Sequence, residues 1–446
     1  MKRDASVANQ ITEGVIWKQL LFFFFPIVLG TFFQQLYNTV DTIIVGRFVG
    51  KEALASVGGS AGQIINLVVG FFTGLASGSS VIVSQFFGAR DEKGLHQSLH
   101  TAYAFSLLGS AVIMLLGIAF TPAMLNLMHT PKELLGDSIL YMRIYFASVP
   151  FVFVFNVGSS ILRAVGDSKR PLYYLVVCCI LNILLDLLLI LVIPLGVAGA
   201  AIATALAQAV SALLVSRALM KSEGGLHLYP KRIRLHPAVL GSQLRIGMPA
   251  GLQTILYNIS NIMIQTSLNG FGTDTTAAWA AYGKLDAIFW MISGAFGIAI
   301  TTFVGQNYGA GRQDRIKKGV WVCMGMDFLV SLGLIIFLLS ARVFLFGIFT
   351  TDRTVVEIGS DMLRMITPCY IFYVFIEVLS GALRGVGDVV MPTIITFVGV
   401  CLLRIVWVLA MMAIHPTVNA IIYSYPVTWV TAAILFIGYY WYRQRN

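Results

Sequence analysis

Apolar stretches recur along the whole chain, each separated from the next by a short segment of charged residues, Gly or Pro. About 20 apolar residues in a helix are enough to cross the hydrocarbon core of a bilayer. The pattern therefore predicts twelve membrane-spanning helices, at 19–46, 53–83, 98–128, 138–162, 171–193, 196–219, 238–270, 276–304, 318–349, 356–383, 391–414 and 418–442.

Composition agrees with a membrane protein and excludes a soluble one. Of the 446 residues 58% are hydrophobic and 11% are charged, and the mean hydropathy is +0.84. A soluble domain cannot bury that much apolar surface. The formal net charge is +10, yet the basic residues lie in short loops and form no groove-reading element, so nucleic acid is not an expected partner. The five cysteines lie in apolar segments without metal-ligand spacing.

The distribution of Lys and Arg predicts the orientation of the helices. With both termini inside, 21 of the 30 basic residues fall in inner loops and tails: Lys2, Arg3, Lys18, Arg90, Lys93, Arg163, Lys169, Arg170, Arg217, Lys221, Lys231, Arg232, Arg234, Arg245, Arg312, Arg315, Lys317, Lys318, Arg384, Arg443 and Arg445. The outer loops hold Arg47, Lys51, Lys132, Arg342 and Arg353. Because cytoplasmic loops carry the excess of positive charge, we expect a multi-pass protein of the cytoplasmic membrane with both termini cytoplasmic.

The chain also repeats itself. ILRAVGDSKRPLY (161–173) matches ALRGVGDVVMPTI (382–394) at six of thirteen positions, where about one match is expected by chance. SQFFGAR (84–90) meets GQNYGAG (305–311) at the same offset of 221 residues. In the shared LRxVGD turn, Gly ends one helix and Asp167 or Asp388 caps the next.

The duplication predicts two halves of six helices that enter the membrane in the same orientation. The polar segment 221–237 lies between them, so the expected domains are an N-lobe at 1–220, a cytoplasmic linker at 221–237 and a C-lobe at 238–446. Parallel repeats of this kind place a cavity between the halves and are typical of secondary transporters. A channel remains an alternative, and a flux that ignores proton and sodium gradients would indicate it.

Ionisable residues inside predicted spans are candidates for function because a charge in hydrocarbon costs several kcal/mol unless it is paired or neutralised. In helix 1, Gln34, Asn38 and Asp41 share one helical face. In helix 5, Asn182 and Asp186 are one turn apart, and helix 6 adds Thr204. Two carboxylates, an amide oxygen and a hydroxyl form an oxygen set that can hold Na⁺ or protons. The alternative for Asp186 is a hydrogen bond to a neighbouring helix.

The C-terminal half does not repeat this set. Asn182 and Asp186 correspond there to Leu403 and Trp407 at the offset of 221. Glu377, which corresponds to Asn156, is expected to line the cavity or to pair with Lys284. Asp286 of helix 8 is a further ionisable candidate within a predicted span, and Asp327 and Arg404 are assigned to packing or rim contacts.

These motifs together resemble the multidrug and toxic compound extrusion family, within the multidrug, oligosaccharidyl-lipid and polysaccharide exporter superfamily. The likeness covers essentially the whole chain and is carried by Pro26, QQLYNTVDTIIVGRFVGKEALA, QFFGA, LRAVGD, LNILLD and GAAIAT. The most similar branch is the DNA-damage-inducible type, which keeps acidic residues in helices 1 and 5. A second branch uses acids in helices 7 and 10, whereas helix 7 here has Gln253 and no acid on the matching face.

The resemblance implies twelve helices in two lobes that form a V-shaped central cleft. It also implies export of small organic, often cationic, compounds in exchange for H⁺ or Na⁺ by a monomer without an organic cofactor. Asp41, Asn182, Asp186 and Thr204 carry over as the coupling site, and Pro26 as the point where helix 1 bends.

Two further functions are weighed against antiport. A lipid-linked oligosaccharide flippase of the same superfamily needs several basic groups in its cavity for pyrophosphate, and this chain has few cations at membrane depth. An intramembrane enzyme needs a nucleophile with a base, or metal ligands, facing one cavity. The six histidines all lie near predicted loops and no HExxH motif occurs, so an enzyme is not expected.

Overall fold

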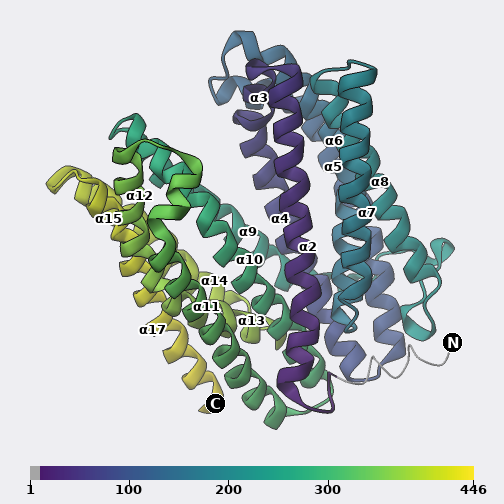
Figure 1. Cartoon of the computed structure of the whole chain (residues 1–446). Coiled ribbons are helices and arrows are strands. Elements are labelled where there is room, and N and C mark those ends of the chain that lie inside the picture. The colour runs from purple at the N-terminus through teal and green to yellow at the C-terminus, as the bar shows by residue number, and fades with distance from the viewer. Residues whose placement is uncertain (1–10, 446) are drawn as a thin grey trace. The chain divides into compact units, whose positions relative to one another are not determined.

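The computed structural model describes residues 11–445, all of whose regular structure is helical (Figure 1). Lys2 and Arg3, two of the basic residues assigned to the inner side, lie outside the described residues. Eleven helical segments are long and apolar enough to cross a membrane: Ile16–Val49, Lys51–Gly88, Glu92–Leu127, Lys132–Ala164, Lys169–Val192, Val197–Met220, Thr273–Gly309, Gln313–Phe349, Arg353–Gly385, Val390–Ile414 and Val418–Arg445. The twelfth long helix, α9 (Pro237–Asn269), is more polar because it carries Gln253, Asn258, Asn261 and Gln265.

The chain folds as two compact units. Unit 1 contains Phe25–Gly251, and unit 2 contains residues 11–24 and 252–445. The division therefore falls inside α2 (Ile16–Ile44) and inside α9, near Pro26 and Pro249. The first helix of each half thus begins in one unit and continues in the other. The predicted lobes 1–220 and 238–446, with their linker 221–237, stay a prediction.

Unit 1 packs around α6 (Lys132–Ala164), which lies against α4 (Ser60–Gly88), α5 (Glu92–Leu127) and α8 (Val197–Met220) (Figure 1). The bundle also contains α3 (Lys51–Gly58) and α7 (Lys169–Asp186). Two π-helical segments, Val45–Val49 and Leu187–Val192, prolong α2 and α7. Between α8 and α9, single 3₁₀ turns form at Gly224–Leu226 and Pro230–Arg232.

Close helix packing in unit 1 depends on small residues. A Cβ atom on Gly78 of α4 would lie 2.1 Å from the carbonyl oxygen of Gln243, and one on Gly74 would lie 2.5 Å from the backbone nitrogen of Gly251. Gly247 and Gly251 on α9 meet backbone atoms of α4 in the same way. Spacing of four residues on both helices lets the two backbones touch, as in other membrane helix pairs.

Unit 2 packs around α10 (Thr273–Gly309) and α13 (Tyr370–Gly385), with α11 (Gln313–Phe349) and α12 (Arg353–Ile366) beside them. A 3₁₀ turn, Thr367–Cys369, joins α12 to α13, so the predicted span 356–383 is interrupted at Pro368. The last segments are α14 (Val390–Thr396), the π-helical Phe397–Leu402, α15 (Leu403–Ile414), α16 (Val418–Ile422) and α17 (Ser424–Arg445).

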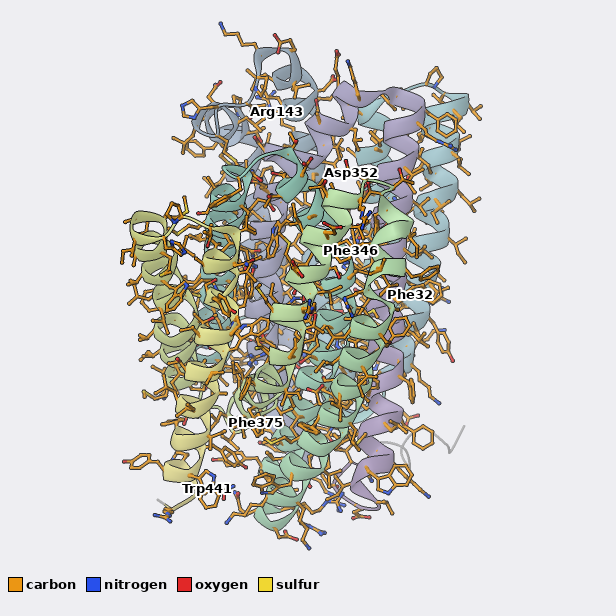
Figure 2. All side chains as sticks on the ribbon, turned by 60° about the vertical axis from the view of Figure 1, so that its left-hand side comes forward. Phe32, Arg143, Phe346, Asp352, Phe375 and Trp441 are labelled. Atoms are coloured by element: carbon orange, nitrogen blue, oxygen red, sulfur yellow. The ribbon has the colours of Figure 1, made fainter. Side chains whose placement is uncertain are left out.

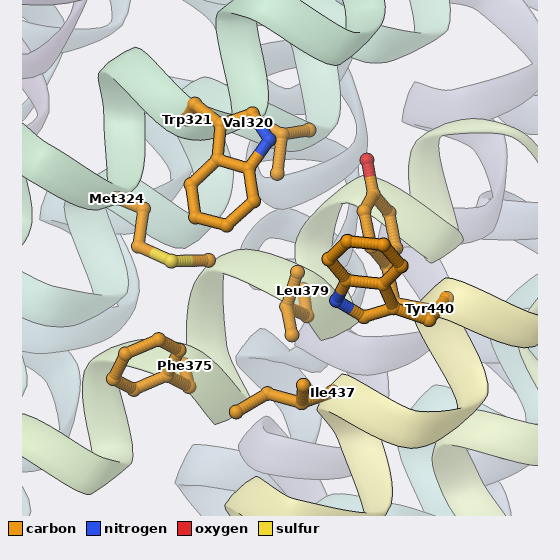
Figure 3. Close-up of a pocket in the computed structure, with 8 residues that line it drawn as sticks. Val320, Trp321, Met324, Phe375, Leu379, Ile437 and Tyr440 are labelled. Carbon is orange, nitrogen blue, oxygen red and sulfur yellow. The ribbon is translucent and has the colours of Figure 1, made fainter. Parts of the chain in front are cut away.

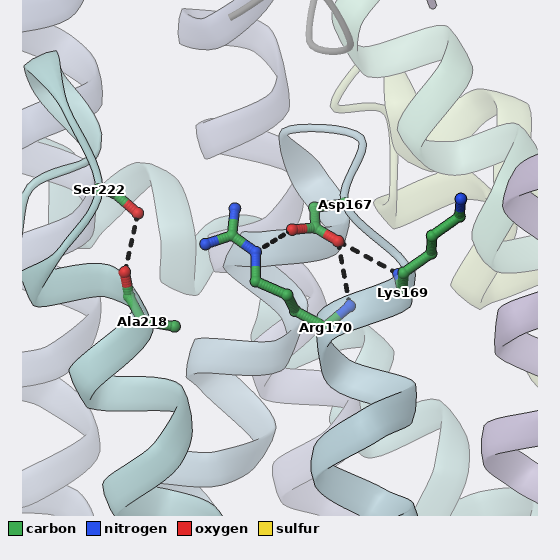
Figure 4. A network of polar contacts seen from close by, with 5 residues as sticks. All are labelled: Asp167, Lys169, Arg170, Ala218 and Ser222. Atoms are coloured by element: carbon green, nitrogen blue, oxygen red, sulfur yellow. Dashed lines mark hydrogen bonds and ion pairs between the residues drawn. The ribbon is translucent and has the colours of Figure 1, made fainter. Parts of the chain in front are cut away.

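The repeated turn has the same backbone in both units. Gly166 and Gly387 have φ values of 95° and 88°, and each nitrogen of the following Asp donates to a carbonyl five residues earlier. Positive φ at this position is the reason for glycine. Asp167 accepts from the backbone nitrogens of Lys169 and Arg170, as predicted for a cap, and pairs with the Arg170 side chain (Figure 4).

Asp388 differs from its counterpart. Its Oδ2 accepts from the Tyr439 hydroxyl at 2.6 Å and from Arg443 Nε at 3.3 Å, and both donors lie on α17. The predicted cap is therefore formed at Asp167, whereas Asp388 joins the turn between α13 and α14 to α17.

Large apolar side chains cover the outside of the helices (Figure 2). Phe32 of α2 is 48% exposed and Trp441 of α17 is 53% exposed. Such exposure is costly in water and favourable in lipid. It agrees with a protein that spans the membrane several times.

Candidate functional site

Helices α2 and α7 bring the two predicted carboxyl groups of unit 1 together. Asp41 on α2 is half-buried, and Asp186, the last residue of α7, is fully buried. The two groups lie close enough to interact directly. Among the described residues, no donor reaches Asp41 Oδ1 or either carboxyl oxygen of Asp186. Two ionised carboxylates have no proton to donate, so a proton or a cation is needed to join them.

Asn182 of α7 and Thr204 of α8 contact each other on neighbouring helices. Asn182 is fully buried one turn before Asp186, and its Nδ2 donates to Thr204 Oγ1 on α8 at 3.4 Å. This leaves the amide oxygen of Asn182 without a donor in the described part of the chain. The π-helical segment Leu187–Val192 starts directly after Asp186, and such segments often accompany functional residues. All four residues of the predicted oxygen set therefore lie in unit 1, on α2, α7 and α8.

Three polar residues near the carboxyl pair were missed by the sequence reasoning. The buried Tyr37 of α2 and Tyr141 of α6 are close enough to Asp41 to interact with it, and Gln208 of α8 hydrogen-bonds Tyr37. Tyr37 precedes Asp41 by four residues, so it shares its helical face. From this spacing Tyr37 could have been predicted to lie near Asp41. Tyr141 could not, because it lies on α6 and no spacing in the sequence relates α6 to α2.

The other candidates of the first half are spread over different environments. Gln34 and Asn38, predicted to share the face of Asp41, are exposed. Pro26 is buried within α2, directly after the boundary between the two units. Asn156 of α6 donates to the carbonyl oxygen of Val152 on its own helix at 2.9 Å.

In unit 2, Glu377 and Lys284 do not pair. Lys284 is exposed, and neither residue takes part in an ion pair among residues 11–445. Glu377 instead accepts from the Tyr373 hydroxyl at 3.3 Å and lies close to Asp327. Asp327 is fully buried and accepts from the Ser331 hydroxyl at 3.2 Å. Unit 2 thus has a carboxyl pair of its own, at positions unrelated to those of unit 1.

Besides Asp327 and Glu377, unit 2 contains Asp286 on α10, which accepts more hydrogen bonds than either of them. It accepts from Tyr370 at 2.6 Å, Trp290 at 2.6 Å and Tyr282 at 3.2 Å. The Tyr370 ring also stacks on Phe289 with centroids 3.8 Å apart. Three neutral donors stabilise a carboxylate without a cation in contact.

Arg404, for which rim contacts were one of the two assignments, lies inside unit 2 and is 2% exposed. It donates to Thr428 at 3.3 Å and to Asn261 at 3.4 Å, and its guanidinium lies 4.2 Å from the Tyr425 ring centroid. A planar cation over an aromatic ring is a favourable contact away from water. Of the two assignments made for Arg404, packing is the one that these contacts support.

Unit 2 also has an apolar groove between α11, α13 and α17 (Figure 3). Its lining comprises Val320, Trp321, Met324, Phe375, Leu379, Ile437, Tyr440 and Trp441. None of these side chains is acidic, so none of the carboxyl groups described above lines the groove.

The chain was compared with known proteins. Residues 26–188 and 249–409 match the family model MatE. The chain is 29% identical to the probable multidrug resistance protein YoeA of Bacillus subtilis over 449 aligned residues. The alignment covers 98% of this chain and 96% of that protein. It is 27% identical to the probable multidrug resistance protein NorM of Thermotoga maritima, over 87% of this chain and 84% of that protein. The multidrug export protein MepA of Staphylococcus aureus is 23% identical, over 84% and 83%.

Solved structures share the fold. A transporter of the MOP superfamily from Pyrococcus furiosus superposes with a TM-score of 0.90 at 22% identity, covering 100% of this chain and 98% of the other. An outward-facing multidrug resistance transporter of the MATE family superposes with a TM-score of 0.89 at 23% identity, covering 98% and 97%. The predicted fold class, an all-helical membrane protein made of two repeats, is thereby confirmed.

Proposed function

Because the chain belongs to the MatE family, we propose that it exports small organic compounds, many of them cationic, in exchange for H⁺ or Na⁺ that binds at Asp41 and Asp186. The relatives supply the class of activity, since those compared above carry names of multidrug resistance or export proteins. These names describe drug resistance or export and no chemical reaction, so no reaction is proposed for the chain.

The carboxyl pair of unit 1 carries the proposal. Three of its four oxygens meet no donor among the described residues, and Asp186 is fully buried. A bare pair of negative charges in a long apolar bundle costs several kcal/mol. The pair is therefore most stable when it shares a proton or holds a cation, and its charge changes when that ion leaves.

Na⁺ fits the same residues. The carboxylates of Asp41 and Asp186 and the free amide oxygen of Asn182 supply hard oxygen ligands, and the Thr204 hydroxyl adds a fourth. Protons and Na⁺ are alternatives because both neutralise the same oxygens.

Antiport follows from competition for one charge. With the ion bound the pair is neutralised, and without it the pair attracts a cationic compound. A ligand shifts a conformational equilibrium only by its difference in affinity between the two states. Coupling requires the ion and the organic compound to favour different conformations of the protein, so that neither crosses the membrane without exchange for the other. The nearby rings of Tyr37 and Tyr141 suit contacts with an organic cation.

The proposal extends to topology and assembly. The chain lies in the cell membrane with both termini cytoplasmic, because most Lys and Arg then lie inside. It works as a monomer, as the family resemblance implies. A reporter fused after Arg445 that functions only in the cytoplasm tests the C-terminal side directly. An inactive reporter, in cells whose membranes contain the fusion protein, would overturn the orientation.

Transport by purified protein in liposomes tests the function. A proton gradient and a sodium gradient are imposed separately, and efflux of a fluorescent organic cation is followed. We expect one gradient to drive efflux, and Asp41→Asn to abolish the response. Asp137→Asn is the matched control, because it removes the same charge from an exposed position in unit 1. Efflux that is independent of both gradients would contradict antiport. Transfer of a lipid-linked oligosaccharide, without efflux of the organic cation, would indicate a flippase.

A further inference from the structure

The guanidinium of Arg315 binds the chain segment that leads into α2. Its Nη1 donates to the carbonyl oxygen of Gly14 at 2.9 Å. Its Nη2 donates to the carbonyl oxygen of Ile11 and to Gln19 Oε1, both at 3.2 Å. Its Nε donates to Asn307 Oδ1 at 3.2 Å. Its Nη2 also donates to the carbonyl oxygen of Glu13 at 3.3 Å. All three nitrogens are thus used, and four of the five acceptors belong to residues 11–19.

Other contacts fix the same segment to unit 2. Asn307 is fully buried, and its Nδ2 lies 3.4 Å from the Ile11 carbonyl oxygen. The Ile11 side chain is buried, and Phe24 stacks on Phe296 of α10 with centroids 4.2 Å apart. We call Arg315, Asn307 and the segment 11–19 the N-terminal anchor. It binds the start of α2 by polar contacts at one end and apolar contacts along the helix.

Helix α2 leaves unit 2 only a few residues after the anchor. The boundary between the units lies between Phe24 and Phe25, and Pro26 follows directly. Proline removes one backbone hydrogen bond of a helix and is the commonest cause of a bend. Beyond this weak point the same helix carries Asp41 in unit 1. One helix therefore connects the carboxyl pair to a fixed point in the other unit.

We propose that Arg315 is a positioning residue for transport, which holds the start of α2 in unit 2 so that a change at Asp41 is passed on through the helix. The inference rests on the proposed function. When an ion enters or leaves the carboxyl pair, the part of α2 in unit 1 changes its preferred conformation. With its start held, the helix transmits that change to unit 2. If residues 11–19 are released from Arg315, the change moves this segment and is not passed on to unit 2.

The chemistry of Arg315 suits an anchor and not an ion site. A guanidinium keeps its charge across the physiological pH range and presents its donors in a rigid plane. Here most of them point at backbone carbonyls, whose positions do not depend on neighbouring side chains. A lysine has the same charge but cannot reach acceptors from three separate nitrogens. We therefore expect that the positive charge of a lysine at position 315 is not enough to hold residues 11–19.

Two readouts test the anchor on the full-length protein in nanodiscs and liposomes. Hydrogen–deuterium exchange reports how firmly residues 11–20 are held, independently of transport. Efflux kinetics report the apparent affinity and the maximal rate. The variants are Arg315→Ala and Arg315→Lys. Lys318→Ala is the control, because Lys318 is an exposed cation one turn further along α11.

We expect both Arg315 variants to exchange residues 11–20 at least about tenfold faster, since several charge-assisted hydrogen bonds are lost. We expect the maximal rate of efflux to fall about tenfold while the apparent affinity for the organic cation stays within about twofold, because the carboxyl pair itself is intact. Protons should also leak without substrate in Arg315→Ala. The control should match the unmodified protein in every readout.

Three results would overturn the inference. Unchanged exchange in Arg315→Ala would show that the guanidinium does not hold the segment. Faster exchange with unchanged efflux would show an anchor without a role in transport. Full activity and protection in Arg315→Lys would show that charge suffices. If the unmodified protein transports under neither gradient, the proposed function fails, while the exchange measurement still decides whether the anchor exists.

Discussion

The buried acids of the two units differ in the number of donors that they meet. In unit 1, Asp41 and Asp186 face each other, and no described donor reaches three of their four carboxyl oxygens. In unit 2, Asp286 accepts three hydrogen bonds, while Asp327 and Glu377 accept one hydroxyl each. Both units contain paired carboxyl groups, but only one pair lacks donors on almost every oxygen.

This difference separates two uses of a buried acid. Donors from the protein stabilise one protonation state and make the acid part of the packing. An acid without donors depends on what binds to it, so its charge follows the occupancy of the site. We therefore expect ion exchange in unit 1, and a structural role for at least Asp286 in unit 2. The predictions below are arranged to test that contrast.

Neutralising the acids one at a time should give the largest difference between the units. We expect Asp41→Asn and Asp186→Asn to lower gradient-driven efflux by about 100-fold, an effect equivalent to ~3 kcal/mol. Asp327→Asn and Glu377→Gln should keep most of the activity, because each loses a charge that the surrounding hydroxyl groups already accommodate. Initial rates in liposomes at equal protein density measure all four. The reverse order would place the exchanging pair in unit 2.

Removing Asp286 should damage stability more than transport chemistry. Asp286→Ala removes the acceptor of Tyr282, Tyr370 and Trp290. The two hydroxyls lie 3.3 Å apart, so one can still donate to the other, while the second hydroxyl and the Trp290 nitrogen lose their partner at about 1–3 kcal/mol each. We expect a clearly lower thermal midpoint in detergent, followed by the intrinsic tryptophan fluorescence of the protein. Asp274→Ala, an exposed acid of the same helix, should leave the midpoint unchanged. Normal stability with lost transport would instead make Asp286 part of the transport site.

Much of the fold could be predicted from the sequence because bilayer thickness sets the length of a spanning helix. Eleven of the twelve predicted spans coincide with helical segments that are long and apolar enough, and α9 supplies the twelfth long helix. The path of α2 and α9 between the units could not be predicted. Proline marks a weak point in a helix but does not indicate which unit each part of the helix joins.

The site was predictable only along single helices. Asn182 and Asp186 are one turn apart, so their shared direction follows from helical geometry. The contact between Glu377 and Asp327 joins α13 to α11, and no spacing in the sequence connects them. The anchor around Arg315 was missed for the same reason, since three of its five acceptors are backbone carbonyls about 300 positions away and carry no residue signature.

Moving the carboxyl group of Glu377 without removing it sharpens the comparison further. A Cβ atom on Gly297 of α10 would lie 2.0 Å from Glu377 Oε1, so Gly297→Ala must displace this carboxyl group. If the acids of unit 2 serve packing, efflux should fall only about fivefold, as expected for overpacking of ~1 kcal/mol. Gly294→Ala is the control, because a Cβ atom there meets open space on the same helix. A loss as large as that of Asp41→Asn would show that the position of Glu377 is critical.

The smallest expected effect concerns the neutral ligands of unit 1. Thr204→Val removes the hydroxyl that accepts from Asn182 at 3.4 Å but keeps the shape of the side chain. A long bond between neutral groups contributes little, so we expect the apparent affinity for the driving ion to weaken about threefold, equivalent to ~0.6 kcal/mol. Thr204→Ser keeps the hydroxyl and should restore the affinity, which the dependence of efflux on the size of the gradient measures. A loss of transport comparable to that of Asp186→Asn would mean that the hydroxyl, and not the carboxyl pair alone, holds the ion, and the contrast between bare and donor-rich acids would then not explain where exchange takes place.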